Sequence, residues 1–441
     1  MTVANSADTP LKVVFVGAED SGGGAARAAT RIFECLWERQ EKLGLDVSMR
    51  VSIAGLDHPA IHGGIPTYGV REKLAYLFRT AFRIVFPRAK THSPQSHLIS
   101  PAREDTGLGR ELRKSGADLV VLNWLGAKTL SVAEIGRLGR KVVWQLHDMW
   151  MFSGAEHYRE HDRAAHGYST KSRPSDEWGP DVNREVFRRK KRLWRNKVPI
   201  VVPSTWLGQE AKKSQLTADW PVFVQPYPLD TDFWQPQDRK ESRQRFGLTD
   251  DALVILFGAA SGTRYSIKGG DVLLEAARII SDTMADDVRR SRIVVAIFGE
   301  EAEPTTAGNI PVMFLGELSD VEIRQAHSAA DVLVVPSRIE NLALVALEGQ
   351  SCGVPLVVSD NTGLTDVVED GVTGFKATKN DPHDFARKIQ LLLDNDQLRK
   401  DFSKAARQRA LKLWHPDTVA ERYASILRHA AGRGVAIVDP L

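Results

Sequence analysis

The chain has 441 residues, with 59 lysines and arginines against 56 aspartates and glutamates. A formal charge of +3 is too small to predict nucleic-acid binding from composition, and 42% hydrophobic residues with a mean hydropathy of -0.26 indicate a globular protein with more than one core. Its two cysteines, Cys35 and Cys352, exclude a disulfide scaffold and a cysteine-built metal site. No apolar run reaches the roughly 18 residues of a membrane span, and a signal-peptide pattern is missing. We therefore expect a soluble, cytoplasmic protein.

The near-neutral total hides an asymmetry along the chain. Residues 1–225 hold 34 basic and 24 acidic side chains, a charge of +10, whereas residues 226–441 hold 25 and 32, a charge of -7. Opposite signs in the two halves predict two domains with different partners.

Short runs rich in valine, isoleucine and leucine alternate with longer helical segments, which predicts parallel sheets built from βαβ units. In the first half the predicted strands are residues 11–16, 47–53, 118–123, 142–146, 199–202 and 222–225. In the second half they are residues 253–257, 293–298, 312–315, 332–335, 355–358 and 374–376. A helix near residue 320 carries a capping box, with Ser319 as its cap and Glu322 three positions later.

The two βα series are separated by a proline-rich stretch that continues as polar sequence to Arg245, and we interpret residues 226–245 as a linker. The fold prediction is α/β, with two doubly wound Rossmann-like domains facing each other across a cleft. Their predicted bounds are residues 1–225 and 226–411. In sheets of this kind ligands bind at the carboxyl ends of the strands, so the residues just after each strand are the candidates for chemistry.

The first candidate is the turn Gly22, Gly23 and Gly24, directly after the first strand and before the first helix. Glycines let the backbone approach a ligand, and unpaired N–H groups at a helix start suit a phosphate. The pattern is not GxGxxG and no acidic residue closes the second strand, so a dinucleotide fingerprint is unsupported. The alternative is a flexible turn without a ligand.

The strongest pattern is a pair of glutamates, Glu340 and Glu348, around a mostly apolar run. The pair follows the predicted strand 332–335, so we expect Glu340 at a loop or helix start and Glu348 on the helix body. An eight-residue helical separation spans about 12 Å, roughly the reach from the sugar to the ribose of a nucleotide sugar, and each carboxylate can accept hydrogen bonds from paired hydroxyls. Backbone N–H groups at the predicted helix start would favour a diphosphate. These groups belong to Asn341, Leu342, Ala343 and Leu344. The alternative, a solvated helix face, is disfavoured by the apolar neighbours.

These residues carry a family resemblance. The glutamate pair, residues 330–337 before it, the S-C-G-V-P turn at 351–355 and D-G-V-T-G-F at 370–375 resemble the GT-B retaining glycosyltransferases of family 4. Residues 22–28, 144–154 and 202–207, with Asn123 and Trp124, resemble the colanic-acid and exopolysaccharide branch of that family. The resemblance covers nearly the whole chain. It implies the GT-B fold and a last helix, residues 412–430, that packs back on the first domain.

The resemblance also implies roles for individual residues. Glu340 would hold sugar hydroxyls, Glu348 the donor ribose, and Lys268 the donor phosphates. His147, at the end of a predicted strand, would contact the donor sugar or the acceptor hydroxyl. We therefore predict Glu340, Lys268 and His147 as catalytic residues, with no metal ion and no cofactor besides the nucleotide-sugar co-substrate.

One departure from the family concerns the donor phosphates. Gly258 is followed by two alanines where relatives often carry Gly-Arg. Either Arg264 takes the role of that arginine or no residue does. Asp230 and Asp232 form a DxD sequence, the metal signature of a different glycosyltransferase fold, and we interpret it as part of the linker.

Two basic segments have competing interpretations. Residues 73–90 place apolar side chains at helical spacing among basic ones, including Arg79 and Arg83, and fit equally a membrane-surface helix or a core-packed helix. We place Arg79, Arg83 and Asp148 on the acceptor or membrane side. Residues 188–192 are predicted to form a basic amphipathic helix rather than a nucleic-acid patch.

A third segment, residues 155–180, replaces a loop that is cysteine-rich in many relatives. It holds His157, His161 and His166 at irregular spacing, and we predict a solvated lid rather than a metal site.

The predicted function is transfer of a sugar from a nucleoside-diphosphate sugar to a hydroxyl of a glycan or lipid-linked acceptor in cell-surface polysaccharide synthesis. The expected location is cytoplasmic, with possible contact to an anionic membrane on the inner face and no nucleic-acid partner. Two alternatives remain: a nucleotide-sugar 2-epimerase of the same architecture, and a degenerate, non-catalytic assembly subunit. Because the second half is acidic, it must bind an anionic donor through local features such as Lys268 and a helix start.

Overall fold

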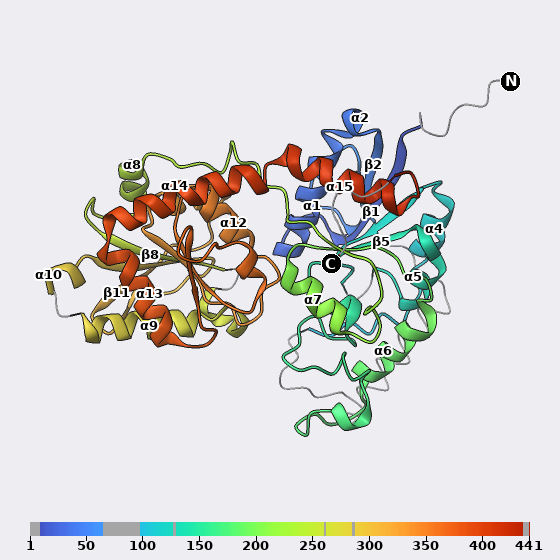
Figure 1. The fold of residues 1–441 in the computed structure, drawn as a ribbon, viewed down its shortest axis with the longest axis horizontal. Coiled ribbons are helices and arrows are strands. Elements are labelled where there is room, and N and C mark those ends of the chain that lie inside the picture. Colours follow the sequence, from blue (N-terminus) through green and yellow to red (C-terminus); the bar gives the residue numbers. More distant parts are fainter. Residues whose placement is uncertain (1–8, 65–97, 127–128, 260–261, 285–286, 435–440) are drawn as a thin grey trace. The chain divides into compact units, whose positions relative to one another are not determined.

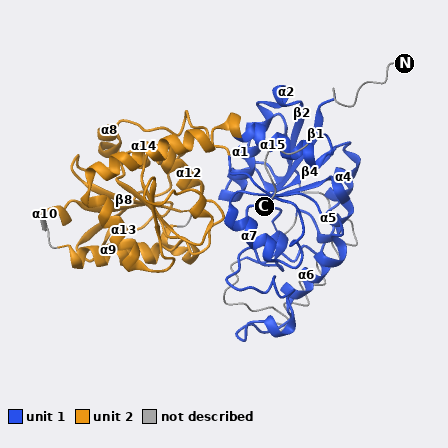
Figure 2. Cartoon of the chain, in the orientation of Figure 1, with its two compact units in different colours: residues 1–227, 419–441 blue, residues 228–418 orange. Residues whose placement is uncertain are grey.

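Two parallel sheets organise the chain, each in a separate compact unit (Figures 1 and 2). The computed structural model describes residues 9–64, 98–126, 129–259, 262–284, 287–434 and 441. Unit 1 comprises residues 1–227 and 419–441, and unit 2 comprises residues 228–418. The division falls at 227/228, against the 225/226 boundary expected from the sequence.

The sheet of unit 1 has seven strands, all paired in parallel. In spatial order they are β3 (Ile61–His62), β2 (Leu45–Ile53), β1 (Leu11–Glu19), β4 (Leu119–Leu122), β5 (Val142–Gln145), β6 (Ile200–Val202) and β7 (Val222–Val224). The central strands are buried on both faces, which explains their continuous apolar sequences. The sequence predicted every strand of this sheet except β3, whose two residues give no periodic signal.

Helices cover both faces of this sheet. They are α1 (Gly24–Trp37), α2 (Gln40–Leu43), α4 (Leu108–Lys114), α5 (Val132–Leu138), α6 (Val182–Leu193) and α7 (Thr205–Lys213). The last helix, α15 (Pro416–Ala430), begins in unit 2 and belongs to unit 1 from Val419 onward. Its Tyr423 is buried, and the phenol donates a 2.9 Å hydrogen bond to Gln145 Oε1 at the end of β5.

Unit 2 repeats the architecture around a second seven-stranded sheet, which is parallel except for the β10–β11 pair. In spatial order the strands are β10 (Thr305–Ala307), β11 (Ile310–Phe314), β9 (Ile293–Phe298), β8 (Leu253–Gly258), β12 (Val332–Val335), β13 (Leu356–Ser359) and β14 (Gly374–Ala377). The helices are α8 (Arg239–Arg245), α9 (Gly270–Thr283), α10 (Asp287–Arg290), α11 (Asp320–Ala329), α12 (Leu344–Ser351), α13 (Pro382–Asp394) and α14 (Asp396–Leu413). The predicted capping box is confirmed, with Ser319 and Glu322 bonded reciprocally at the start of α11.

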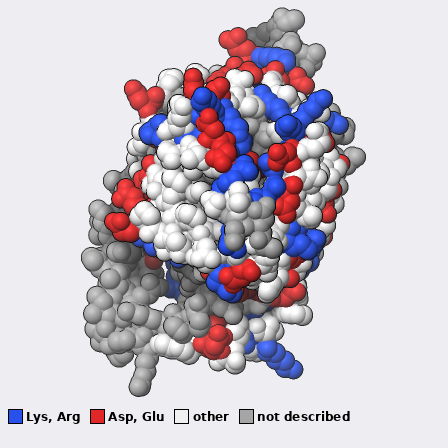
Figure 3. All heavy atoms as spheres, turned by 90° about the vertical axis from the view of Figure 1, so that its left-hand side faces the viewer, with Lys and Arg blue, Asp and Glu red and all other residues white. Residues whose placement is uncertain are grey.

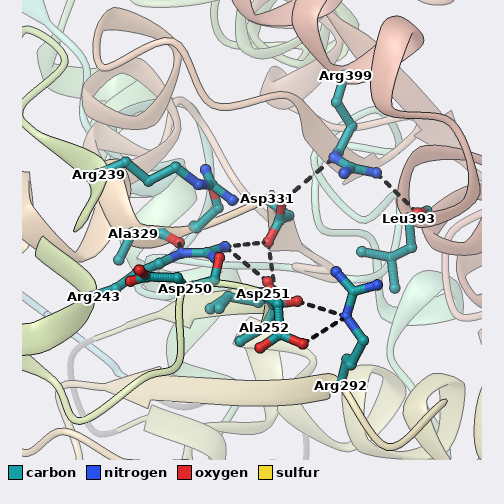
Figure 4. A network of polar contacts seen from close by, with 12 residues as sticks. Arg239, Arg243, Asp250, Asp251, Ala252, Arg292, Ala329, Asp331, Leu393 and Arg399 are labelled. Atoms are coloured by element: carbon teal, nitrogen blue, oxygen red, sulfur yellow. Dashed lines mark hydrogen bonds and ion pairs between the residues drawn. The ribbon is translucent and has the colours of Figure 1, made fainter. Parts of the chain in front are cut away.

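The predicted linker is wrong over its second half. Residues 239–245 form α8, and its Arg243 is buried against the body of unit 2. Figure 4 shows the reason: Asp331, just before β12, accepts from Arg243 at 3.0 Å and pairs with Arg239 at 2.6 Å and Arg399 of α14 at 3.4 Å. A buried carboxylate needs such partners, so α8 is a fixed part of the unit and not a tether.

The segment predicted as a solvated lid, residues 155–180, is also different in the structure. Some of its polar side chains are buried, among them Glu156, Arg159 and Glu177, whereas others, such as Glu160 and His166, are exposed. Arg163 is 1% exposed, pairs with Glu177 at 3.2 Å and Asp181 at 2.5 Å, and lies 4.9 Å from the centre of the Tyr168 ring. Irregular spacing and high polarity predict a solvated segment. In the structure, charge pairing allows some of its polar residues to lie in the interior.

Basic and acidic side chains lie side by side on the molecular surface. On the molecular face in Figure 3, lysines and arginines are interspersed with aspartates and glutamates. In the described part of the chain, no helix has both the length and the apolar character needed to cross a bilayer.

Candidate functional site

In unit 2, the candidate site lies where β8 and β12 end side by side. After β8 the chain forms a short 3-10 turn, Ser266–Lys268, and then enters α9. Gly269 has a φ of 71°, and a Cβ atom there would lie 2.1 Å from the carbonyl oxygen of Pro336. Only glycine permits both the backbone angle and this approach, so the sequence Lys268-Gly269 places the lysine against the turn after β12.

Lys268 and Glu340 meet in this turn. The Lys268 ammonium donates a 2.7 Å bond to Glu340 Oε2, and the side chains are 28% and 11% exposed. The Ser337 hydroxyl lies 3.4 Å from the same carboxylate oxygen. The Glu340 carbonyl also accepts a 2.7 Å bond from the Gly363 amide, which fixes the backbone of this loop to the loop after β13. Contacts with Lys268, Ser337 and Gly363 therefore fix Glu340, while the Lys268 side chain keeps partial access to solvent.

The glutamate pair lies as predicted, with Glu340 in a loop and Glu348 on a helix, although the separation between them is not helical throughout. Helix α12 begins only at Leu344, with Ala343 as its cap, so Glu340 lies in the preceding loop and only Glu348 lies on the helix. Glu348 is 3% exposed, which excludes the solvated-face interpretation. Because α12 has no acidic residue in its first turn, the positive end of its dipole is not offset by its own sequence.

Arg264, the candidate replacement for the missing arginine, is engaged elsewhere in this structure. Its Nε lies 3.1 Å from Glu300 Oε1, and its side chain is 69% exposed. The other Glu300 oxygen accepts from the Thr263 amide at 2.7 Å and from the Thr263 hydroxyl at 2.8 Å. Glu300, just after β9, thus organises the turn that carries Arg264, a role that the sequence prediction missed.

Tyr265 is a second residue that was missed. It is half-buried beside the lysine and glutamate, and burial raises the pKa of its phenol, with the Lys268 charge acting in the opposite direction. A phenol in this place adds a hydrogen-bond donor to the site. Its position between the 3-10 turns of a Ser-Gly-Thr-Arg-Tyr loop carries no motif, so only the folded turn identifies it.

In unit 1 the candidate residues follow three adjacent strand ends. Strand β4 lies between β1 and β5, so the loops after these strands share one edge of the sheet. The glycine turn follows β1, and Gly22 has a φ of 100°. A Cβ at Gly23 or Gly24 would have no atom within 4 Å, so the chain's own packing does not require glycine at either position. Space beside a helix start is what a phosphate contact needs.

The turn is anchored by Asp20, another residue without a predicted role. Its buried carboxylate accepts bonds from the amides of Gly55 at 2.8 Å and Leu56 at 3.2 Å, which joins the loop after β1 to the loop after β2. An aspartate between a strand and a glycine run is a usable signal for such an anchor.

His147 is buried after β5, and both of its ring nitrogens have partners. Nε2 lies 3.0 Å from Asn123 Oδ1 and Nδ1 lies 2.9 Å from the Tyr227 hydroxyl. The amide oxygen only accepts, so Nε2 carries the proton and Nδ1 accepts from the phenol. Burial lowers the pKa of His147 to about 4, partly opposed by Asp148, so the ring is neutral at pH 7. In this arrangement it is a positioned hydrogen-bonding group rather than a proton carrier.

Asp148 is likewise committed to internal bonds. Its Oδ1 accepts from the Trp150 amide at 2.9 Å, and its Oδ2 lies 2.5 Å from Nδ1 of His157. The other nitrogen of His157 lies 2.6 Å from the Ser100 hydroxyl. All of these side chains are buried, so Asp148 lies inside unit 1, and its assignment to the acceptor or membrane side stays a prediction.

Two further predictions concern the basic segment at residues 73–90 and the DxD sequence. Arg79 and Arg83 fall outside the described residues. Asp230, of the DxD sequence, accepts from the amides of Asp232 at 3.1 Å and Phe233 at 2.9 Å, which is turn chemistry. Among the described residues, no three histidines, cysteines or carboxylates gather in a way that could hold a metal ion.

Comparison with known proteins gives a family match that lies within unit 2. The family of glycosyl transferases group 1 matches residues 238–409. A D-inositol 3-phosphate glycosyltransferase of Geodermatophilus obscurus is 36% identical over 203 residues, covering 43% of each chain. A protein of the same name from Streptosporangium roseum is 38% identical over 170 residues, 35% of this chain and 37% of the relative. The chain thus spans less than half the length of these curated relatives.

Solved structures match over both units. HepE of Anabaena, solved in complex with UDP and glucose, superposes with a TM-score of 0.63 at 15% identity, over 95% of this chain and 100% of that one. Sucrose-phosphate synthase from Thermosynechococcus elongatus gives 0.63 at 17% identity, over 95% and 98%. At such identities the likeness concerns the fold. The two Rossmann-like sheets of this chain match those of GT-B glycosyltransferase structures, and residues 238–409 of unit 2 match the group 1 glycosyl transferase family.

Proposed function

We propose that the protein is a retaining glycosyltransferase that moves a sugar from a nucleoside-diphosphate sugar to an acceptor hydroxyl. The observation that carries the proposal is the Lys268–Glu340 pair, at 2.7 Å, within the segment that matches group 1 glycosyl transferases. A cation beside a buried carboxylate at the carboxyl ends of parallel strands suits a diphosphate next to a polyhydroxyl group. HepE of Anabaena, which has the same fold, has been solved in complex with UDP and with UDP-glucose, and this supports a donor of this class.

In the proposed mechanism the protein supplies charge and position rather than a nucleophile. Lys268 and the start of α12 stabilise the departing diphosphate, because positive charge there is worth most as negative charge develops. Glu340 accepts bonds from sugar hydroxyls and Glu348 from the donor ribose. The donor phosphate takes the proton of the acceptor hydroxyl on the same face of the sugar, so the configuration is retained. No metal ion is part of the proposal.

The acceptor that we propose is a hydroxyl of a glycan or lipid-linked glycan in exopolysaccharide synthesis, on the motif resemblance of the first half. A second candidate acceptor, an inositol phosphate, is favoured by the relatives from Geodermatophilus obscurus and Streptosporangium roseum, which are D-inositol 3-phosphate glycosyltransferases.

Donor recognition can be tested with the purified chain. UDP-, GDP-, ADP- and dTDP-sugars are compared by thermal shift and by hydrolysis, and the stabilising donor is then offered with a lipid-linked glycan extract or with inositol phosphate. We expect one nucleotide class to raise the melting temperature and support acceptor-dependent transfer with retention. Donor conversion to the 2-epimer without transfer would establish the epimerase instead. Binding without turnover would indicate a non-catalytic subunit, and no stabilisation by any donor would refute the donor site.

A further inference from the structure

The outer face of α6 carries a row of arginines. Arg184, Arg188 and Arg192 are four positions apart and so stand on one line of the helix, with Arg189 beside them. Together with Asp181 and Glu185 they line a hollow of about 470 Å³. The predicted basic amphipathic helix is present, but its basic residues divide: Lys190 is fully buried on the opposite side, and the arginines face the hollow.

The positive charge of this row is only partly offset by neighbouring carboxylates, with Glu185 and Glu104 acting on Arg189. None of the four arginines forms an ion pair with a described carboxylate, although two acidic side chains lie in the same hollow. Those two carboxylates have other partners. Asp181 bonds Arg163 and caps α6, and Glu185 bonds Arg103.

Other charged groups face Arg189 from the segment before α4. Glu104 attracts it and Arg103 repels it, while Asp105 is taken by Arg137 at 2.5 Å and by the Ser131 hydroxyl. The line of Arg184, Arg188 and Arg192 carries three guanidinium groups over about 12 Å of helix.

Two nitrogens in the hollow lack the partners that burial demands. Arg184 Nε and Arg189 Nη1 are shielded from solvent and have no hydrogen-bond acceptor. Withdrawal from water lowers the pKa of the Arg189 guanidinium, and the Glu185 charge acts in the opposite direction. A buried donor on a charged group is costly unless an acceptor satisfies it, so these two side chains would gain a partner if they turned toward an anion in the hollow.

We propose that this hollow is a binding site for a ligand that carries two or more linked phosphate groups. Guanidinium groups bind phosphate oxygens in a bidentate fork, and a row of three matches a chain of phosphates rather than a single one. The hollow gives phosphates space to lie beside the arginine side chains, which a flat array of charges would not. The site belongs to unit 1 and is independent of the donor site proposed in unit 2.

The test measures the binding of sodium tripolyphosphate to the full chain by calorimetric titration at fixed salt. Orthophosphate is the single-phosphate comparison. The row variant replaces Arg184, Arg188 and Arg192 by glutamine. Its matched control replaces Arg110, Arg113 and Lys114, three exposed basic residues of α4, and so removes the same charge from the same unit. A second arm measures flotation with phosphatidylcholine vesicles that contain a polyprenyl diphosphate, whose headgroup has two linked phosphates, and this arm separates a lipid source of the phosphates from a soluble one.

We expect tripolyphosphate to bind more tightly than orthophosphate, with at least about a tenfold loss in the row variant and less than about a twofold change in the control. Flotation lost in the row variant alone would assign the phosphates to a lipid headgroup. Equal loss in both triple variants, or no binding of either probe by the unmodified chain, would overturn the proposal. If the row variant fails to fold, the three lysine substitutions keep the charge and remove the fork, and unchanged affinity in that variant would overturn it as well.

Discussion

Lys268 and Glu340 neutralise each other across 2.7 Å, and the proposed chemistry asks opposite things of them. The lysine attracts the donor diphosphate, whereas the glutamate repels it and binds the sugar. Lys268→Met should therefore weaken nucleoside-diphosphate binding and slow transfer by about 100-fold, because charge stabilisation of the leaving group is lost. Glu340→Gln should slow transfer while nucleoside diphosphate binds as tightly as before or more tightly.

The measurement is kcat and KM for transfer together with product affinity by calorimetry. Lys400→Met, at an exposed position of α14, is the matched control and should leave both quantities unchanged. Parallel losses of nucleotide affinity in both site variants would show that the pair is a structural bridge and not a donor site.

His327 of α11 is a buried histidine with no partner for either ring nitrogen among the described residues. Burial lowers its pKa from 6.5 to about 3. Between these values the unfolded state binds more protons than the folded state, so stability falls as the pH falls through this window and is unaffected above it. His327→Leu should remove this dependence and raise the free energy of unfolding by about 2 kcal/mol at pH 5 relative to its effect at pH 8.

The free energy of unfolding is measured at the two pH values by urea unfolding, with far-ultraviolet circular dichroism as the signal. His383→Leu, an exposed histidine at the start of α13, serves as the control and should not change the difference between pH 5 and pH 8. Identical pH profiles for His327→Leu and the unmodified chain would mean that His327 is protonated or hydrogen-bonded in the folded protein.

At the scale of elements, α6 is tied to the turn after β5 through Lys190. The ammonium donates to the carbonyls of Trp150, Ser153 and Gly154, and it lies 3.8 Å from the centre of the Trp150 ring. Burial lowers the pKa of Lys190 well below its usual value. This one side chain satisfies three backbone acceptors in the turn that follows His147 and Asp148.

Lys190→Met keeps the length of the side chain but leaves those carbonyls without a donor. We expect a loss of about 3 kcal/mol in the free energy of unfolding, because each unsatisfied buried group costs about 1 kcal/mol or more. Lys191→Met, the exposed neighbour on the same helix, should change it by less than about 0.5 kcal/mol. Equal stability of the two variants in urea would contradict a stabilising role of the three hydrogen bonds that Lys190 donates.

The sequence alone predicts the elements that have regular apolar patterns and fails where polar residues are buried. Strand runs, the capping box at Ser319 and the position of the Lys268–Glu340 loop follow from local pattern, because each depends on neighbours in the sequence. Arg163 and Lys190 look solvated by composition. Their partners come from other segments of the chain, so only the folded arrangement shows that they belong to the interior.

The same distinction applies to the candidate site. Residue types and spacing select Lys268, Glu340 and Glu348, but the loop before α12 separates the two glutamates in a way that a helical spacing does not describe. The partners of His147 are equally invisible, since Asn123 and Tyr227 lie far from it in the sequence. A pattern thus identifies groups able to do chemistry, while their protonation and orientation are set by tertiary contacts.

At the scale of the whole molecule, the end of the chain completes its beginning. Residues 419–441 belong to unit 1, and Tyr423, Ile426 and Leu427 are at most 1% exposed there. Arg428 donates to the Leu43 carbonyl, and Arg433 donates a 2.9 Å bond to the Thr9 carbonyl. Unit 1 therefore has part of its core supplied by a segment made after all of unit 2.

A chain that ends at Thr418 should accordingly lose the stability of unit 1 while unit 2 melts as before. Burial of three large apolar side chains contributes several kcal/mol, about the net stability of a domain of this size. Differential scanning calorimetry should show two transitions in the full chain, with the one assigned to unit 1 lost or strongly lowered after truncation. A chain that ends at Gly434 keeps the buried residues of α15 and should retain both transitions. Retention of both by the chain ending at Thr418 would show that unit 1 folds without the helix, and that α15 only covers a core already complete.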